Sequence, residues 1–188
     1  YDNRPNRSDC KSAPVCTYAE EIQNFANWYT YYRSRILAAR AGIGRAFATQ
    51  GNTIRVGFTT INSGSTMLRN VAPFTGTQRA GFFTDLYNGK FNSIHYTPLR
   101  TSLQDVGNYF SRTDNNGPWA TSAGSTAAHL TCRQSYNILM TDGYWSEGRS
   151  YNPNPAVGDL DKDGTADTLA DVSLNYWKTD LRTDLVNK

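Results

Sequence analysis

The sequence predicts an α/β fold in which a mostly parallel sheet is flanked by helices. Two observations support this prediction. Segments with the apolar spacing of amphipathic helices alternate along the chain with short β-branched segments, an order typical of parallel strands joined by crossover helices. In addition, residues 136–141 form a mainly apolar run between turn residues, as expected for a central strand buried on both faces. A chain of 188 residues is long enough for one domain with its own core.

The first predicted element is a long helix over residues 18–49. Thr17 and Glu20 have the spacing of a capping box, in which each side chain accepts a hydrogen bond from the other residue's backbone amide. Beyond this start, apolar residues recur at steps of three and four, which places them on one face of a helix. These residues are Ile22, Phe25, Tyr29, Tyr32, Ile36, Ile43 and Phe47.

Shorter elements are predicted in the middle of the chain. Alternating β-branched residues predict a strand over residues 54–61, and a second, shorter strand is expected over residues 67–74. Residues 81–87 have the pattern of a short helix, and residues 97–110 have that of a longer amphipathic helix. Residues 111–131 are rich in Gly, Ser, Thr and Asn, so we expect a long loop insertion there.

Charge and hydropathy argue against two classes of protein, namely nucleic-acid-binding proteins and membrane-spanning proteins. The net charge is +3 and the 19 Lys and Arg residues are dispersed, so the sequence carries no basic patch for nucleic acid. No apolar run approaches the roughly 18 residues that a membrane-spanning helix requires, so the chain is not expected to span a membrane. The first residues lack the pattern of a signal peptide, so we expect either a cytosolic protein or one whose leader has been removed.

Three cysteines bear on the compartment. Cys10 and Cys16 are close enough in sequence for a small local disulfide loop, with two unrelated thiols as the alternative. A disulfide here favours an oxidising compartment. Cys132 is left over from this pairing. Because it precedes the predicted central strand, we expect it to be a buried thiol, with a partner outside this chain as the alternative.

An acidic loop over residues 159–167, followed by a last predicted helix over residues 169–181, has the pattern of a calcium site. Carboxylates stand at loop positions 1, 3, 5 and 9, with Gly164 at position 6 where a calcium loop turns sharply. Position 12 holds Ala170 instead of Glu, and Asp171 is the expected substitute. The alternative is a solvated acidic turn, although clustered carboxylates repel one another unless a cation holds them. We expect a structural Ca²⁺ ion bound by Asp159, Asp161, Asp163, Thr165, Asp167 and Asp171.

A second candidate metal site is only partly visible in the sequence. Asp142 follows the predicted central strand, and open α/β sheets bind ligands beyond the carboxyl ends of their strands. Thr97 precedes Pro98 at the predicted start of a helix, which would place its hydroxyl at that helix start. The simpler alternatives are that Thr97 is a plain helix cap and Asp142 a turn residue.

A resemblance to a known family makes these fragments more informative. A strand followed by Thr-Asp-Gly, with a Thr-Pro-Leu helix start upstream, resembles the von Willebrand factor A domain. Over residues ~18–185 the chain more closely resembles the N-terminal region of PilC/PilY-type type IV pilus tip adhesins. The resemblance is carried by residues 25–29, 32–35, 44–47, 55–58, 135–145, 168–172 and 176–182. It implies that residues 1–188 are one von Willebrand factor A-like domain without its first strand and its C-terminal strands.

The resemblance also implies a function and a place. The family pattern is a metal-ion-dependent adhesion site, in which Thr97 and Asp142 match two ligands. The Asp-x-Ser-x-Ser segment of that site is absent and is expected upstream of Tyr1, so Mg²⁺ would be held only with upstream residues. We therefore expect a non-enzymatic adhesion or pilus-biogenesis module. It would act outside the cell, at a pilus tip or the bacterial outer surface after passing the periplasm, on pilus minor subunits or a host or surface receptor.

Two other functions stay open at this stage. A secreted glycan-processing hydrolase could use Trp119, Tyr144 and Trp145 as a sugar platform, with Asp142 and Glu147 as its carboxylate pair. Trp119 could instead be an exposed anchor for a partner protein. The sequence contains no recognisable nucleophile–base arrangement and no phosphate loop, so we assign no catalytic residue. A purely structural, calcium-stabilised domain is the remaining alternative.

Overall fold

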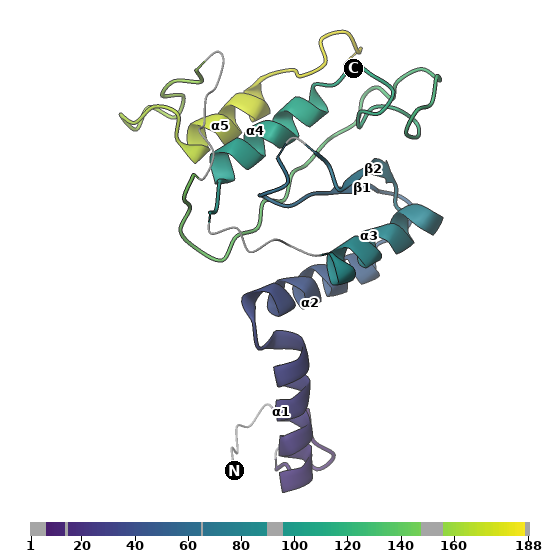
Figure 1. Ribbon diagram of the computed structural model, residues 1–188, viewed down its shortest axis with the longest axis vertical. Helices are drawn as coiled ribbons and strands as arrows, with labels where there is room; N and C mark the ends of the chain where they lie inside the picture. The colour runs from purple at the N-terminus through teal and green to yellow at the C-terminus, as the bar shows by residue number, and fades with distance from the viewer. Residues whose placement is uncertain (1–6, 14, 65, 90–95, 148–155, 187–188) are drawn as a thin grey trace. The chain divides into compact units, whose positions relative to one another are not determined.

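The computed structural model describes residues 7–13, 15–64, 66–89, 96–147 and 156–186 (Figure 1). Contacts along the chain divide it into an N-terminal unit, Tyr1–Thr49, and a C-terminal unit, Gln50–Lys188. The expected single domain over residues 1–188 stays a prediction. None of the described helices is long and apolar enough to cross a membrane.

The N-terminal unit contains two helices, α1 (Tyr18–Tyr32) and α2 (Arg35–Ala48), where the sequence predicted one. The capping box at the start of α1 is confirmed, with Thr17 and Glu20 each accepting from the other's amide. The continuous helix was wrong because Ser34 interrupts it. Ser34 has an extended backbone, with φ −126° and ψ 154°, and its hydroxyl accepts a hydrogen bond from the Leu37 amide at 3.3 Å. A serine in this role starts a new helix.

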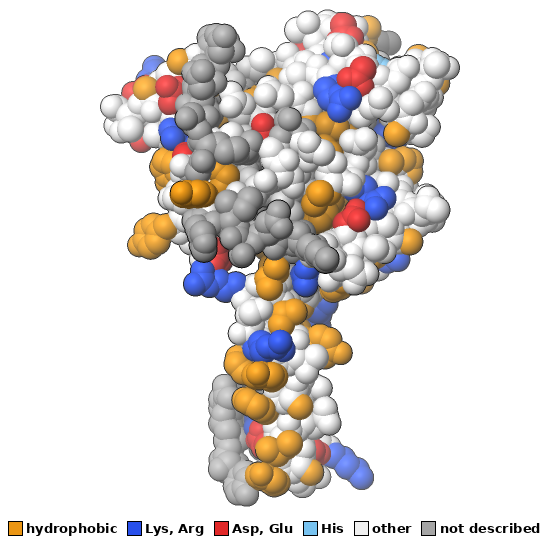
Figure 2. Space-filling model, in the orientation of Figure 1, with side chains coloured by type: hydrophobic (Ala, Val, Ile, Leu, Met, Phe, Trp, Pro, Cys, Tyr) orange, Lys and Arg blue, Asp and Glu red, His pale blue; other side chains and the backbone are white. Residues whose placement is uncertain are grey.

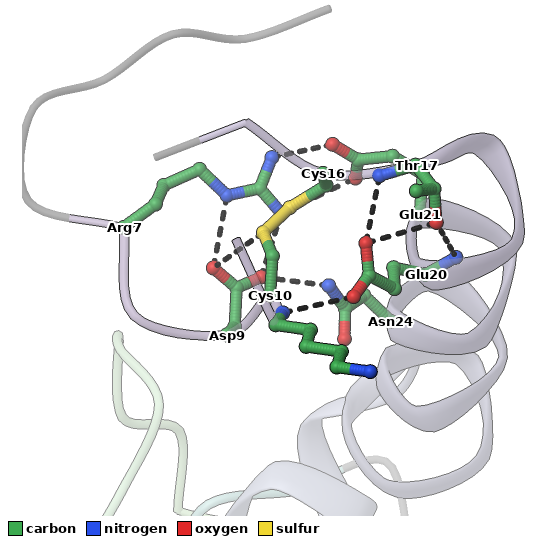
Figure 3. Close-up of a disulfide and its surroundings, with 9 residues drawn as sticks. Arg7, Asp9, Cys10, Cys16, Thr17, Glu20, Glu21 and Asn24 are labelled. Carbon is green, nitrogen blue, oxygen red and sulfur yellow. Dashed lines mark hydrogen bonds and ion pairs between the residues drawn. A yellow bond between two sulfur atoms is a disulfide. The ribbon is translucent and has the colours of Figure 1, made fainter. Parts of the chain in front are cut away.

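A disulfide fastens the segment before α1, as predicted. Cys10 and Cys16 are joined, with their Cα atoms 5.2 Å apart (Figure 3). Around this bond, Arg7 pairs with Asp9 at 2.6 Å and with Glu21 of α1 at 2.5 Å. The hydrogen bonds that Arg7 donates to these two carboxylates raise the pKa of its guanidinium. The disulfide therefore closes the segment just before α1, and the ion pair of Arg7 with Glu21 ties it to the first turns of the helix.

The C-terminal unit is built on a small sheet and three helices. Strand β1 (Arg55–Phe58) pairs antiparallel with β2 (Arg69–Pro73), with an irregularity between Val56 and Phe58. The helices are α3 (Gly76–Asn88), α4 (Leu99–Phe110) and α5 (Leu169–Lys178). All five elements fall where the sequence predicts them, although α3 begins earlier than expected. The apolar core of this unit is formed by Val56, Phe74, Phe82, Leu86, Leu99, Tyr109, Ala120 and Val172.

Helices α4 and α5 lie side by side (Figure 1). The Tyr176 ring of α5 packs over Gly107 of α4, where a Cβ atom would overlap the ring. The Tyr176 hydroxyl donates to the Gln104 carbonyl at 3.3 Å. On the sheet, the Val71 amide donates to the Tyr109 hydroxyl of α4 at 2.9 Å. This packing holds the C-terminal part of α5 against α4.

The predicted central strand is not formed. Residues 136–141 have no strand structure in the described chain, and Tyr136 and Ile138 are 78% and 77% exposed. An apolar run becomes a buried strand only when neighbouring strands pair with it, and the sheet of the described residues consists of β1 and β2 alone. That sheet is antiparallel, so the α/β class holds only in the broad sense of mixed helix and strand. The expected burial of Cys132 was wrong for the same reason, since it is exposed beside this segment.

Residues 111–131 carry no helix or strand, but they are well anchored. The Arg55 guanidinium donates to the carbonyls of Pro118, Ala120 and Thr121 at 3.3, 2.7 and 3.1 Å. Trp119 is half-buried, and its indole N–H donates to the Phe110 carbonyl at 2.6 Å. The structure thus uses Trp119 to pack this loop against the end of α4.

Candidate functional site

The acidic loop is a compact turn held by its own carboxylates. The backbone takes positive φ at Lys162 (64°), Gly164 (91°) and Asp167 (58°). Asp159 accepts from the Asp163 amide at 3.1 Å with one carboxylate oxygen, and from the Gly164 amide at 3.0 Å with the other. Gly164 suits the tightest point because a residue without Cβ adopts this conformation without steric cost.

Asp171 connects this loop to helix α5. Its side chain is fully buried, and one oxygen accepts from the amides of Leu160 and Asp161 at 2.6 and 3.2 Å. The other oxygen accepts from the amide and the hydroxyl of Thr168, both at 2.8 Å, which completes a capping box for α5. Asp171 therefore reaches back from the first turn of α5 into the loop.

Three carboxylates converge in the described part of the chain. Asp159, Asp161 and Asp171 each offer an oxygen, and these oxygens lie within 4.8 Å of one another. A partial loss of hydration, together with the negative charges of Asp163, Asp171 and Asp159, raises the pKa of Asp161. Desolvation is the largest single influence on Asp171 and opposes ionisation, but the hydrogen bonds from Thr168, Leu160 and Asp161 together lower its pKa. An added cation would relieve the repulsion at Asp161.

Asp163 and Asp167, which were also predicted as calcium ligands, do not belong to this group of three carboxylates. Asp163 accepts from the Thr165 amide at 2.8 Å. Asp167 turns away and accepts from the amides of Val157 and Gly158, each at 3.0 Å, which closes the base of the loop. Three convergent carboxylates suit a hard cation such as Ca²⁺, whose remaining ligands would be other oxygens, including water. The residues present therefore fit the ion, with Asp159, Asp161 and Asp171 as its carboxylate ligands.

The start of α4 is capped by a residue that the sequence analysis did not assign to this role. Pro98 takes the N-cap position without a side-chain hydrogen bond, so the Thr97 hydroxyl does not cap this helix. Instead, Glu147 accepts from the Arg100 amide at 3.1 Å and from the Thr101 hydroxyl at 2.8 Å. No local pattern could have revealed this cap, because Glu147 is 47 residues away from Arg100 along the chain.

The Arg100 side chain reaches the acidic loop from the same place. Its Nη1 donates to the Asp167 carbonyl at 2.9 Å, and its Nε donates to Glu147 at 3.2 Å. Its guanidinium also lies over the Trp145 ring, 4.7 Å from the ring centre. Arg100 thus contacts the acidic loop and the segment that follows Asp142.

The two predicted adhesion-site residues belong to neighbouring segments. Thr97 forms an isolated antiparallel bridge with Ser146, with amide-to-carbonyl distances of 2.9 and 3.1 Å. Asp142 lies four residues before Ser146 and is exposed. The structure therefore joins the Thr97 segment to the segment that carries Asp142.

In the predicted hydrolase pair, Asp142 and Glu147, the glutamate is already engaged in other contacts. The Glu147 side chain is 11% exposed, and both of its oxygens accept hydrogen bonds at the start of α4. A carboxylate in this position serves as a helix cap and ion-pair partner. Of the proposed sugar platform, Tyr144 is fully exposed, whereas Trp119 packs against Phe110 with ring centres 6.2 Å apart.

A separate apolar surface lies along α1. Figure 2 shows hydrophobic side chains gathered along this helix. None of the helix residues is buried, and its aromatic rings contact one another, with Phe25 and Trp28 at 5.8 Å between ring centres. The large exposed side chains are Tyr18, Ile22, Phe25, Trp28, Tyr29, Tyr31 and Tyr32.

Comparison with known proteins gives one consistent group. The chain is 35% identical over 213 residues to "Type IV pilus biogenesis factor PilY1" of Pseudomonas aeruginosa strain PAO1, an alignment that covers 97% of this chain and 18% of the relative. Proteins of the same name from strains PAK and UCBPP-PA14 are each 32% identical, over 95% and 87% of this chain. The chain spans less than a fifth of the length of these curated relatives. No family model matches the chain, and no solved structure matches it.

Proposed function

Because this chain is homologous to a segment of the PilY1 type IV pilus biogenesis factors, we propose that it is a binding module of such a protein. Its work is adhesion and pilus biogenesis, without enzymatic chemistry. The module acts at the pilus tip or the bacterial outer surface, and its partners are pilus minor subunits or a surface receptor. The disulfide between Cys10 and Cys16 supports this placement, since such bonds persist in oxidising compartments.

The function depends on a structural calcium ion in the acidic loop. The observation that carries this proposal is the convergence of Asp159, Asp161 and Asp171 within 4.8 Å. Asp171 belongs at once to the cap of α5 and to the loop, so an ion here would join the two and order the start of the helix. Because Asp171 holds the loop and caps α5 at the same time, an ion bound to it would serve mainly to stabilise this junction, which supports a structural role.

We also propose that the adhesion site is completed by residues outside this chain. In a von Willebrand factor A-like sheet, residues 136–141 would pair with strands from the rest of the polypeptide and would then be buried. Asp142 at the end of that strand and Thr97 beside Ser146 would supply two ligands to a divalent ion such as Mg²⁺. The bridge between Thr97 and Ser146 supports this arrangement, because it brings the two segments together.

The contacts of Glu147 argue against the glycan-processing alternative. Glu147 caps α4 and pairs with Arg100 at 3.2 Å, so it is not a free partner for Asp142. The purely structural alternative shares the calcium loop and differs only in lacking a partner.

Calcium is expected to stabilise the chain, and the substitution Asp161→Asn should remove most of that effect. Saturating Ca²⁺ should raise the melting temperature of the wild-type chain by roughly 5 °C, because the ion binds only the folded loop. Isothermal titration calorimetry and thermal melts with and without EDTA measure both effects. In the full-length protein, the same substitution should reduce the number of surface pili when calcium is limiting.

Asp114→Asn is the matched control for this experiment. Asp114 pairs with Arg112 at 2.8 Å and belongs to the 111–131 loop, so its variant should keep the wild-type response to calcium. Equal melting curves of the wild-type chain in Ca²⁺ and in EDTA would contradict the calcium proposal.

A further inference from the structure

One arginine connects the acidic loop with the segment beside the predicted adhesion residues. Arg100 is in the first turn of α4, and its side chain is 22% exposed. Its guanidinium contacts the Asp167 carbonyl, the Glu147 carboxylate and the Trp145 ring. These three residues come from two segments that are far from α4 in the sequence. All of these contacts lie within the C-terminal unit.

The contact on the loop side depends on the shape of the loop. Asp167 closes the base of the loop, because its carboxylate accepts from the amides of Val157 and Gly158 and its own amide donates to the Gly158 carbonyl at 3.1 Å. The next residue, Thr168, shares the capping box with Asp171, one of the three convergent carboxylates. A change in the loop on ion binding would therefore act directly beside the Asp167 carbonyl.

The contact of Arg100 with Glu147 depends on residues 145–147 holding a fixed conformation. Glu147 accepts from three donors at the start of α4, namely the Arg100 amide, the Arg100 Nε and the Thr101 hydroxyl. Ser146 exchanges two backbone hydrogen bonds with Thr97. An arginine fork held at the loop by one nitrogen orients the carboxylate that its other nitrogen binds.

We propose that Arg100 is a positioning residue that couples cation binding in the acidic loop to the order of residues 145–147, and so to the placement of Thr97 and Asp142. The proposal rests on the proposed calcium function of the loop. Coupling of this kind is reciprocal. If ion binding favours the ordered state of residues 145–147, the ordered state raises the affinity of the loop for the ion by the same factor. The calcium loop then serves to set the geometry of the neighbouring segment as well as to stabilise α5.

Amide hydrogen exchange of the 188-residue chain tests the coupling directly. In the wild-type chain, saturating Ca²⁺ should slow exchange of the Ser146 and Thr97 amides by about fivefold, at the lower end of typical coupling between sites. Arg100→Lys keeps the charge but cannot reach the Asp167 carbonyl and Glu147 with one planar group, so the slowing should be lost. Its calcium affinity should fall by the same factor of about five.

The control is Arg112→Lys, because Arg112 follows α4 and pairs with Asp114 instead of the acidic loop. This variant should retain both the slowing and the wild-type calcium affinity. If Arg100→Lys does not fold, Glu147→Gln provides the second test, since it removes the charge that pairs with Arg100 while keeping the size of the side chain and one acceptor oxygen, and the slowing at Ser146 should again be lost. Calcium binding without slowed exchange at Ser146 in the wild-type chain would overturn the coupling alone. Absence of calcium binding would overturn the coupling and the calcium proposal together.

Discussion

At the scale of single residues, Asp171 and Asp161 show how similar carboxylates take opposite roles. Asp171 is buried but receives four hydrogen bonds, and these hold its pKa below the usual range despite desolvation. Asp161 lies among other carboxylates, and partial desolvation and their charges raise its pKa. Asp171 is therefore a stable anion that organises the loop, and Asp161 is the carboxylate that gains most from a cation.

Asp171→Asn should destabilise the calcium-free chain, with a melting temperature lower by roughly 5 °C at pH 7. The amide offers one acceptor oxygen in place of two and turns an N–H toward backbone donors. Because the folded-state pKa of Asp171 is lowered, its contribution to stability is present above the unfolded pKa of roughly 3.9 and is lost as the pH falls through the folded value.

Thermal melts of both proteins between pH 7 and pH 3 measure this effect. The difference between wild type and Asp171→Asn should shrink below about pH 4, where this carboxyl begins to be protonated in the unfolded chain. A difference that stayed constant down to pH 3 would show that the charge of Asp171 contributes nothing to folding.

At the scale of elements, some helices depend on residues that are close in the sequence, and others depend on residues that are far away. Local residues set the start of α1, through Thr17 and Glu20, and the start of α2, through Ser34. The start of α4 instead depends on Glu147, and the α4–α5 contact depends on the lack of a side chain at Gly107. Glycine is otherwise unfavourable inside a helix, so its presence at Gly107 reflects this packing.

Two glycine-to-alanine substitutions in helices should have opposite effects. Gly42→Ala in α2 should stabilise the chain by about 0.5–1 kcal/mol, because no described atom lies within 4 Å of the new Cβ. Gly107→Ala in α4 should destabilise it by about 1–3 kcal/mol, because the new Cβ overlaps the Tyr176 ring. Chemical denaturation of both variants measures the two free energies. Equal and favourable effects would mean that the α4–α5 contact is looser than described.

At the scale of the whole molecule, the core is concentrated in one unit. Of the buried apolar side chains in the described residues, only Cys16 lies in Tyr1–Thr49, and the others lie in Gln50–Lys188. The helix α1 buries none of its residues, whereas its exposed face is strongly aromatic. Most stability from apolar burial therefore belongs to the C-terminal unit.

A fragment of residues 50–188 should therefore fold by itself. It keeps the described core, so its cooperative melting transition should lie within about 5 °C of that of the longer chain. Circular dichroism and differential scanning calorimetry of both proteins test this expectation. A broad transition without a heat-absorption peak would show that Tyr1–Thr49 supplies packing that the C-terminal unit requires.

The sequence alone determined the features that depend on residues close together in the chain. The capping box at Thr17, the Cys10–Cys16 disulfide and the turn at Gly164 are formed by neighbours, so spacing and residue type suffice to predict them. The same holds for the places of α3, α4 and α5. The resemblance to PilC/PilY-type proteins also came from the sequence, and the similarity to the PilY1 relatives confirms it.

Only the tertiary structure decided which distant residues meet. Of the six residues predicted as calcium ligands, it brought the carboxylates of Asp159, Asp161 and Asp171 together, and it turned Asp167 toward the loop base. It also left most of residues 136–141 exposed, because strand formation depends on partners that a local pattern does not reveal. Arg100 contacts Glu147 and Asp167 across 47 and 67 residues, and no periodicity or motif encodes contacts over such separations. Packing of the folded chain creates them.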